Sequence, residues 1–382
     1  MKPSFAPHRS ASNCFQPFLT KYGACILDGG LTTSLPNNAE KHFLWGHQLL
    51  YNLDGGLPAL KKVHLDFLNA GAKVIGTLSY KLSLELVKEC WKRGMLNDME
   101  EKCAREEELE SHTEMLFQRS IQAAKDARDE YWSGAVAVKT ASTSTTTALS
   151  NEASKPPATA EISDESVKPL VFGSVGPCRD STMLFVGATD PNTRSDGSEM
   201  EIRMRTYYRQ KLGMLKKAGV DGFSVETLAG SREALVAAEE SAAFDLPLLV
   251  SFCCPDDKVT NSGETIEDCA KALEPFSHVH AIGVNCINPC FAPGLVSKLR
   301  QTTSLPIAVY PNSGEVWNAA EGQRCWHDGD HMKVLDGTDA VAFHQAGASL
   351  IGGCCYALQI CLRLEECQLV MRISQHIKVS HA

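Results

Sequence analysis

Short apolar runs recur eight times along the chain, and amphipathic helical patterns separate most of them. Each run has the length and continuous hydrophobicity of a parallel strand that is buried on both faces. Eight strand–helix units in succession predict an α/β fold of the closed (β/α)8 type, the TIM barrel. A doubly wound open sheet is the alternative, which is disfavoured because no run precedes a GxGxxG phosphate loop. The predicted strands are Ala24–Leu27, Val74–Gly76, Leu170–Gly173, Gly222–Val225, Leu248–Phe252, Ala281–Val284, Ile307–Tyr310 and Ser349–Gly352.

The predicted helices between these runs carry their apolar residues on one face and end at recognisable caps. Gly71 and Gly219 each follow such a pattern directly, as expected of a C-terminal cap. Ser231 is the expected N-terminal cap of its helix, with Glu233 near the first turn. The predicted helices are Leu57–Ala70, Arg203–Ala218, Ser231–Ala243, Thr265–Leu273 and Pro293–Thr302.

The length of 382 residues suits a single barrel domain with insertions, because such barrels need about 250 residues and can exceed 400. The expected organisation is a flexible N-terminal tail over 1–22 and a barrel over 23–382. The charge-rich stretch 81–132 is expected to form a solvated helical insertion. Residues 139–169 consist mainly of Ala, Ser, Thr and Lys, which bury too little apolar surface to offset the entropy of ordering. A disordered insert is therefore expected there.

Charge and cysteine content limit the partners and the compartment. The net charge of −9 and the pI near 5.8 argue against nucleic acid as the main partner. No apolar run reaches the roughly 18 residues that span a bilayer, so no membrane partner is expected. The 15 cysteines are scattered and the N-terminus lacks a signal-peptide core, which indicates the reducing cytoplasm. A transit peptide is the disfavoured alternative, and the oligomeric state stays open.

Polar and glycine-flanked residues follow the predicted strands, where a barrel of this type places its active residues. Asp28-Gly29-Gly30, Thr77, Glu226-Thr227, Asn285-Cys286 and Cys354-Cys355 all lie at such positions. Adjacent cysteines rarely bridge each other, because the ring that they would close is strained. The Cys354–Cys355 pair suits a soft metal ion better. Buried, reduced cysteines that only pack in the core remain the alternative.

An ordered set of motifs resembles the homocysteine S-methyltransferase family from about Gly23 to about Tyr356. Leu44-Trp45 and Ser79-Tyr80 are closer to the branch that uses S-methylmethionine or S-adenosylmethionine. After Cys355, the chain departs from the family pattern. The motifs that carry the resemblance are Asp28-Gly29-Gly30, Glu226-Thr227, Gly283-Val284-Asn285-Cys286, Tyr310-Pro311-Asn312-Ser313-Gly314-Glu315 and Gly352-Gly353-Cys354-Cys355.

The resemblance implies a catalytic Zn²⁺ held by the thiolates of Cys286, Cys354 and Cys355. It also implies that Asp28 and Glu226 hold the ammonium group of homocysteine. A buried ion pair with a Lys or Arg is the alternative for Glu226. The other residues expected to line the substrate pocket are Gly29, Gly30, Thr77 and Asn285.

The expected reaction is methyl transfer from a sulfonium donor, S-methylmethionine or S-adenosylmethionine, to L-homocysteine, which gives methionine. Trp45, Trp317 and Trp326 are candidates for cation–π contact with the sulfonium, against ordinary loop packing. A betaine or folate donor, or an impaired homologue that binds zinc as a sensing module, are the alternatives.

Overall fold

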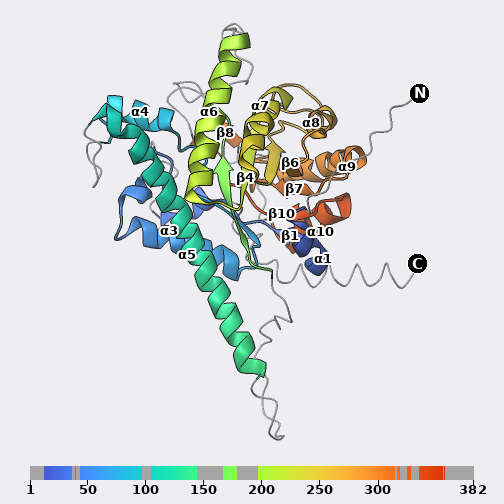
Figure 1. Cartoon of the computed structure of the whole chain (residues 1–382). Helices are drawn as coiled ribbons and strands as arrows, with labels where there is room; N and C mark the ends of the chain where they lie inside the picture. The colour runs from blue at the N-terminus through green and yellow to red at the C-terminus, as the bar shows by residue number, and fades with distance from the viewer. Residues whose placement is uncertain are drawn as a thin grey trace, which may run out of the picture.

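The computed structural model describes residues 13–36, 39, 44–96, 105–143, 167–178, 197–314, 316–318, 325–327, 335–355 and 357. Eight parallel strands form one sheet in the order β1-β10-β7-β6-β5-β4-β3-β2, and helices surround them (Figure 1). This confirms the predicted (β/α)8 barrel. The strands are β1 (Cys25–Ile26), β2 (Val74–Gly76), β3 (Leu170–Val175), β4 (Gly222–Leu228), β5 (Leu248–Phe252), β6 (Val279–Asn285), β7 (Ile307–Tyr310) and β10 (Leu350–Ile351).

The first and last strands of the barrel meet, although they lie at opposite ends of the sequence. Cys25 pairs with Leu350, and Leu350 also pairs with Ala308 of β7. An isolated parallel bridge from Leu27 to Val74 joins the β1 side to β2 and completes the ring. A separate antiparallel pair, β8 (Val316–Asn318) with β9 (Cys325–His327), lies between β7 and β10 in the sequence.

Local sequence signals account for many of the helix boundaries. Thr265 caps α8 by accepting from the Asp268 backbone, and Asp336 forms a capping box with Asp339 at α10. Gly71 follows α3 with φ 105°, as its expected cap position requires. The helices are α1 (Gln16–Tyr22), α2 (Leu31–Ser34), α3 (Gly56–Asn69), α4 (Leu84–Lys92), α5 (Leu109–Thr143), α6 (Gly197–Ala218), α7 (Ser231–Ser241), α8 (Ile266–Leu273), α9 (Ala292–Thr302) and α10 (Gly337–Ala346).

Ser231 is not the N-cap of α7, contrary to the prediction. Gly230 occupies the cap position without a side-chain hydrogen bond. The hydroxyl and backbone N–H of Ser231 both donate to the carboxylate of Glu264 instead. A partner from a distant segment therefore replaces the local cap.

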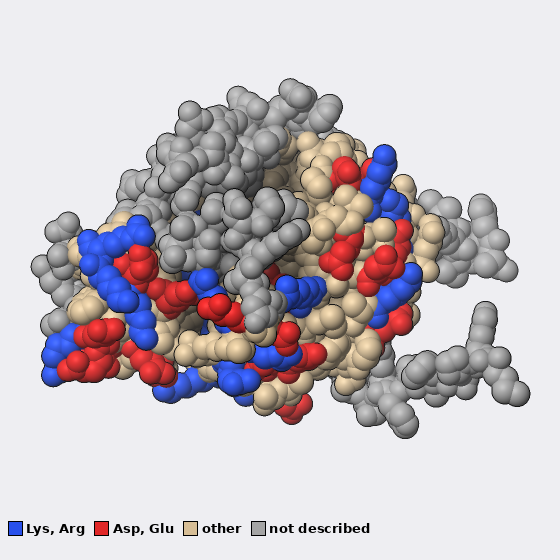
Figure 2. All heavy atoms as spheres, turned by 90° about the horizontal axis from the view of Figure 1, so that it is seen from above, with Lys and Arg blue, Asp and Glu red and all other residues tan. Residues whose placement is uncertain are grey.

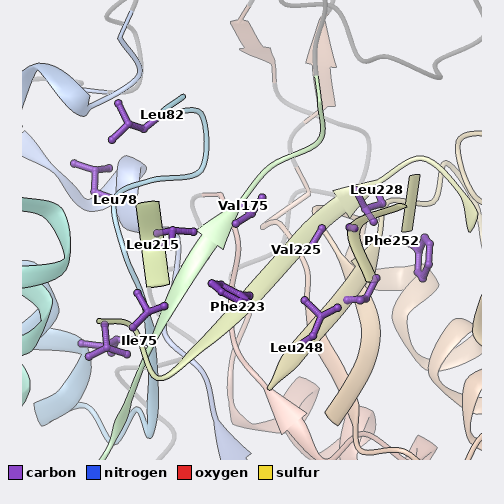
Figure 3. Close-up of a cluster of buried hydrophobic side chains, with 14 of the residues drawn as sticks. Ile75, Leu78, Leu82, Val175, Leu215, Phe223, Val225, Leu228, Leu248 and Phe252 are labelled. Atoms are coloured by element: carbon purple, nitrogen blue, oxygen red, sulfur yellow. The ribbon is translucent and has the colours of Figure 1, made fainter. Parts of the chain in front are cut away.

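The outer core lies between the strands and the surrounding helices. Its side chains come from alternate residues of the strands, as the two-residue period of a strand requires. In Figure 3, Phe223 and Val225 of β4 lie between Leu215 of α6 and Leu248 of β5. These four side chains are fully buried.

The end of the predicted flexible tail is ordered. Residues 13–22 lead into and form α1, whose Phe15 and Phe18 are fully buried. The Phe15 ring lies 5.6 Å from the ring of Phe172 on β3. These rings join an apolar cluster inside the barrel, so α1 covers the N-terminal ends of the strands. The prediction of a flexible tail was wrong for this part, while residues 1–12 lie outside the described residues.

The helix α5 is a structural element of the barrel rather than a solvated insertion. It packs against α3, α6 and β3. Leu116, Phe117 and Ile121 are fully buried, although Glu106 and Glu107 ahead of the helix are exposed, as predicted for this acidic stretch. The helix continues to Thr143, so the start of the predicted disordered insert is helical, and its continuation over 144–166 lies outside the described residues. Figure 1 shows this end of α5 projecting beyond the barrel.

The described surface carries mixed charge. Figure 2 shows Lys and Arg interspersed with Asp and Glu across the face that it presents, so this face has no basic stripe of the kind that binds nucleic acid. Within the described residues, no helix combines the length and apolar character needed to cross a membrane.

Candidate active site at the mouth of the barrel

Three thiols meet at the C-terminal ends of the strands. Cys286 follows β6, and Cys354 and Cys355 follow β10, so 68 residues separate the first from the pair. The Cys286 and Cys354 sulfurs lie 2.8 Å apart and the Cys354 and Cys355 sulfurs 4.0 Å apart. All three sulfurs lie within 4.8 Å of one another. Three thiols this close together could hold a metal ion, and thiolates are ligands that soft or borderline metal ions prefer.

The backbone around the thiols is held by the segment that follows β7. The N–H of Cys286 donates to the carbonyl of Tyr310, and the N–H of Cys354 donates to the carbonyl of Pro311. Cys286 itself has a left-handed backbone, with φ 52°. Such a conformation is unfavourable for a residue other than glycine and is typical of functional sites. Hydrogen bonds to one shared segment therefore fix the relative positions of the two cysteine loops.

Two pairs of glycines bring the Asp28 loop and the Cys354 loop into direct backbone contact. A Cβ atom on Gly30 would lie 2.4 Å from the carbonyl oxygen of Cys354, and one on Gly352 would lie 2.6 Å from that of Asp28. The N–H of Gly353 donates to the same Asp28 carbonyl. Side chains at these positions would separate the loops. The glycines therefore place a carboxylate beside the thiols.

The carboxyl groups of Asp28 and Glu226 line the same cavity, and both residues are half-buried. Asp28 accepts from the N–H of Gly76 at 2.7 Å, and Glu226 accepts from the hydroxyl of Ser174. Burial raises the pKa of Asp28 to about 8, with a further contribution from the negative charge of Glu226. Burial likewise raises the pKa of Glu226 to about 7, against the hydrogen bond from Ser174. The charge of Lys211 lowers the pKa of Glu226, but no salt bridge of Glu226 is found among the described residues.

Asn285 holds the loop that follows Glu226. Its side-chain carbonyl accepts from the N–H of Thr227 and from the hydroxyl of Ser251, both at 2.8 Å. Its amide nitrogen donates to the Thr227 hydroxyl, and Thr227 has a left-handed backbone with φ 65°. The Ser251 hydroxyl is also hydrogen-bonded to the hydroxyl of Tyr310. Asn285 thus lies in the cavity wall, where its known contacts fix the backbone beside Glu226.

Thr77 also lies in the wall of the cavity. Its hydroxyl is hydrogen-bonded to that of Ser79 at 2.7 Å and accepts from the N–H of Ser174 at 3.3 Å. Because Ser174 donates to Glu226, Thr77 supports the position of that carboxylate through one intermediate residue.

One cavity of about 620 Å³ contains every site residue predicted from the sequence. Its predicted members are Asp28, Gly29, Gly30, Thr77, Glu226, Asn285, Cys286, Cys354 and Cys355. The sequence analysis assigned no site role to Lys81, Ser174 or Cys253, which also line the cavity. Ser174 directly follows the third predicted strand, Leu170–Gly173, and that position was the available signal.

The predicted aromatic contacts are only partly described. Trp45 lines the cavity, and the ammonium of Lys81 lies 3.3 Å from the centre of its ring. One face of this indole therefore already has a cationic partner. The side chains of Trp317 and Trp326 lie outside the described residues.

Asn312 offers the cavity an acceptor without a partner. Its side chain is 3% exposed, lines the cavity, and has a carbonyl oxygen that accepts no hydrogen bond from the residues that the structure describes. A buried amide in this state costs free energy unless a ligand satisfies it. The sequence placed Asn312 in a motif but assigned it only to the shape of the loop.

The fold and the site define a TIM-barrel protein with thiol and carboxyl groups gathered at the carboxyl ends of its strands. The family model for homocysteine S-methyltransferase matches residues 25–359. The chain therefore belongs to the homocysteine S-methyltransferase family.

Named relatives agree with this assignment. Homocysteine S-methyltransferase 4 from Zea mays is 31% identical over 355 residues, which cover 90% of this chain and 89% of the relative. Homocysteine S-methyltransferase 1 from Arabidopsis thaliana is 28% identical, with 90% and 93% covered. Selenocysteine methyltransferase from Astragalus bisulcatus is 29% identical, with 88% and 90% covered.

A solved structure supports the fold. The homocysteine methyltransferase MmuM from Escherichia coli, in its metallated form, superposes with a TM-score of 0.64 and 24% sequence identity. The match covers 90% of this chain and 98% of that protein.

Proposed function

We propose that this enzyme transfers a methyl group from a sulfonium donor to the thiol of L-homocysteine and thereby forms methionine, with Zn²⁺ bound by Cys286, Cys354 and Cys355. The meeting of these three thiols in one cavity with two half-buried carboxyl groups carries the proposal. Zinc in catalytic sites takes three protein ligands and leaves a fourth position for substrate. A relative that is described as metallated shares the fold, which supports a metal at this place.

The three cysteines account for activation of the acceptor. A free thiol has a pKa near 8.5 and reacts as its thiolate. A zinc ion held by these sulfurs supplies the positive charge that keeps a substrate thiol ionised at neutral pH. The loop contacts that fix Cys286 and Cys354 hold the donor atoms in place before substrate arrives.

Asp28 and Glu226 account for recognition of the acceptor's ammonium group. Both carboxyls have a raised pKa when the cavity holds no cation: about 8 for Asp28, which favours its protonated form near neutral pH, and about 7 for Glu226, which leaves its two forms comparable. A bound ammonium favours the ionised carboxylates and lowers both pKa values. The orphan carbonyl of Asn312 is a further acceptor for an N–H donor of the substrate.

A sulfonium donor fits the remaining groups. Its S–CH3 bond breaks as the new C–S bond forms on homocysteine, the electron pair stays on the leaving sulfur as a neutral thioether, and the acceptor's thiol proton has already passed to solvent. No general acid is needed. The nitrogen leaving group of a methylfolate would need a proton, yet burial lowers the pKa of His47, the one histidine among the described lining residues, to about 3. The two carboxyls are assigned to the ammonium.

The test is product analysis with separate donors. Side-chain-deuterated L-homocysteine is incubated with zinc-loaded protein and S-methylmethionine, S-adenosylmethionine, betaine or methyltetrahydrofolate. Deuterium distinguishes acceptor-derived methionine from methionine released by the donor. We expect labelled methionine with a sulfonium, and its loss after chelation with recovery on adding zinc.

Other outcomes decide between the alternatives. Labelled methionine only from betaine or methyltetrahydrofolate would replace the donor assignment. Zinc binding without turnover of any donor would favour a sensing module. Full activity in the chelated protein would remove the zinc from the mechanism.

A further inference from the structure

The charges that line the cavity are unevenly distributed. Two carboxyls, those of Asp28 and Glu226, face one Lys or Arg among the described lining residues, which is Lys81. His47 contributes no charge, because burial lowers its pKa to about 3. An amino-acid ligand brings both an ammonium and a carboxylate. The acid pair suits the first group, and Lys81 is the side chain whose charge suits the second.

The backbone next to Lys81 is fixed by hydrogen bonds. The carbonyl of Tyr80 accepts from the buried ammonium of Lys211 at 2.7 Å and from the N–H of Gly176 at 2.9 Å. Lys211 also donates to the hydroxyl of Tyr207, which in turn donates to the carbonyl of Gly176. This network joins the loops that follow β2 and β3 to α6. The backbone position of Tyr80, the residue before Lys81, is therefore fixed.

The side chain of Lys81 is held as well. Its ammonium lies 3.3 Å from the centre of the Trp45 ring. The Trp45 backbone is left-handed, with φ 50°, and Gly46 follows with φ 89°. A cation over an aromatic face keeps donors for an anion on its other side. The ammonium of Lys81 is thus preorganised rather than free to sample many rotamers.

Lys81 lies where the cavity meets a second one. The neighbouring cavity has a volume of about 520 Å³, extends between α4 and α6, and shares Tyr80 and Lys81 with the first. An acceptor with its sulfur at the thiols and its ammonium at Asp28 and Glu226 has its carboxylate on the same α-carbon as that ammonium. Its carboxylate therefore lies beside the acid pair, and the border position is left for a second amino acid.

We propose that Lys81 binds the α-carboxylate of an amino-acid methyl donor and so determines donor specificity. This inference rests on the proposed methyl transfer. It assigns Lys81 to binding of the donor and not to the transfer step. Donors without a negatively charged carboxylate are then poor substrates because this contact is missing.

Matched donors and matched variants test the assignment. The donors are S-methyl-L-methionine and its carboxamide, which keeps the sulfonium and loses the negative charge. The variants are Lys81→Met, Lys81→Arg and the control Lys88→Met, which removes the same charge from the second cavity only. We expect Lys81→Met to lower kcat/KM for S-methyl-L-methionine by about 10- to 100-fold. We expect little change for the carboxamide, partial recovery in Lys81→Arg, and an unchanged KM for homocysteine.

Four results would overturn the proposal. Equal losses with both donors would show a general effect on the fold or the chemistry, and a similar loss in Lys88→Met would show a long-range charge effect. If Lys81→Met raised only the KM of homocysteine, Lys81 would bind the carboxylate of the acceptor instead of that of the donor. If the wild type transfers no methyl group, calorimetric binding of S-methyl-L-methionine decides separately: equal affinity of wild type and Lys81→Met, or no binding to either, refutes the role of Lys81.

Discussion

The two ends of the barrel interior are built from the same strands but have opposite chemistry. At the N-terminal end, Phe15 of the segment before α1 packs on Phe172, and both belong to an apolar cluster that also contains Leu249. Two residues further along their strands, Ser174 and Ser251 face the same interior with hydroxyls that hold the catalytic mouth. One strand therefore supplies packing at its start and polar positioning at its end.

The two ends of the barrel interior contribute differently to the stability of the fold. Apolar burial at the N-terminal end is favourable. At the mouth, Asp28 and Glu226 bind their protons more tightly in the folded protein than in the unfolded chain, where carboxyl pKa values are near 4. The ligand-free protein therefore loses stability as pH rises from about 4 through 7 to 8. The favourable free energy of apolar burial at the N-terminal end offsets the cost of keeping the carboxyls of Asp28 and Glu226 at the mouth.

The largest expected effect comes from removing a thiol at the mouth of the barrel. Cys286→Ser removes one metal ligand and with it several kcal/mol of charge stabilisation, which corresponds to a loss of at least about 1,000-fold in methyl transfer. Metal analysis should show substoichiometric zinc. Cys290→Ser, at an exposed thiol, is the matched control and should keep both zinc and activity. Retention of both by Cys286→Ser would contradict the assigned ligand set.

The next largest effect comes from truncating an apolar side chain at the N-terminal end of the barrel. Phe15→Ala should lower the free energy of unfolding by about 3 kcal/mol, the low end for such a truncation, because a short helix at the edge of the barrel can relax. Activity per folded molecule should stay near that of the wild type. Urea denaturation with the exposed-site control Gln16→Ala checks this. A selective loss of zinc in the folded variant would show that the two ends are coupled.

A smaller effect separates binding from stability at the mouth. Glu226→Gln should weaken homocysteine binding by about 10- to 100-fold, since it removes one carboxylate from the ammonium site. At pH 8 the ligand-free variant should be more stable than the wild type, because residue 226 then has no carboxyl group that must ionise. Calorimetry and thermal melts at pH 5 and pH 8 measure the two changes. Glu274→Gln, at an exposed carboxyl, should alter neither.

The smallest expected effect comes from removing the hydroxyl of Ser174 at the mouth. Ser174→Ala removes the hydrogen bond that lowers the pKa of Glu226, so that pKa rises. Homocysteine binding should then need a higher pH, with less than about tenfold weaker affinity at pH 7. The pH dependence of the dissociation constant gives the shift. Ser120→Ala, at a buried hydroxyl without a hydrogen bond, is the control; an unshifted profile in Ser174→Ala would show that Glu226 does not govern binding.

The strand framework and the positions of the site residues could be predicted from the sequence. Continuous apolar runs mark strands that are buried on both faces, and polar groups directly after them must gather at one end of a parallel barrel. Cys286 and Cys354 were placed together by this reasoning and the family resemblance. The structure brings their sulfurs within hydrogen-bonding distance.

Elements that depend on a distant partner were missed. The residues ahead of α1 are held by His280 of β6, which accepts from the Asn13 amide and the Cys14 N–H, and no local pattern reveals this contact. In α5, the many charged residues concealed a buried stripe. Phe117, Ile121 and Ala124 lie on that stripe, and their spacing of four and three residues was the available signal.

Lys81 and Trp45 show the same limit within the site. They come from separate loops, and the contact between them depends on the left-handed backbone of Trp45. Residue type and spacing do not predict a positive φ at a tryptophan.

The seam between β1 and β10 has a consequence for biosynthesis. Cys25 cannot pair with Leu350 until residue 350 has left the ribosome. At about 5–20 residues per second, the intervening stretch takes roughly 16 to 65 seconds to make. During that interval Gly30 has no Gly352 loop to pack against, and of the three proposed ligands only Cys286 can already be present in the nascent protein. If these cysteines bind a metal as proposed, they can do so together only after β10 has joined the barrel.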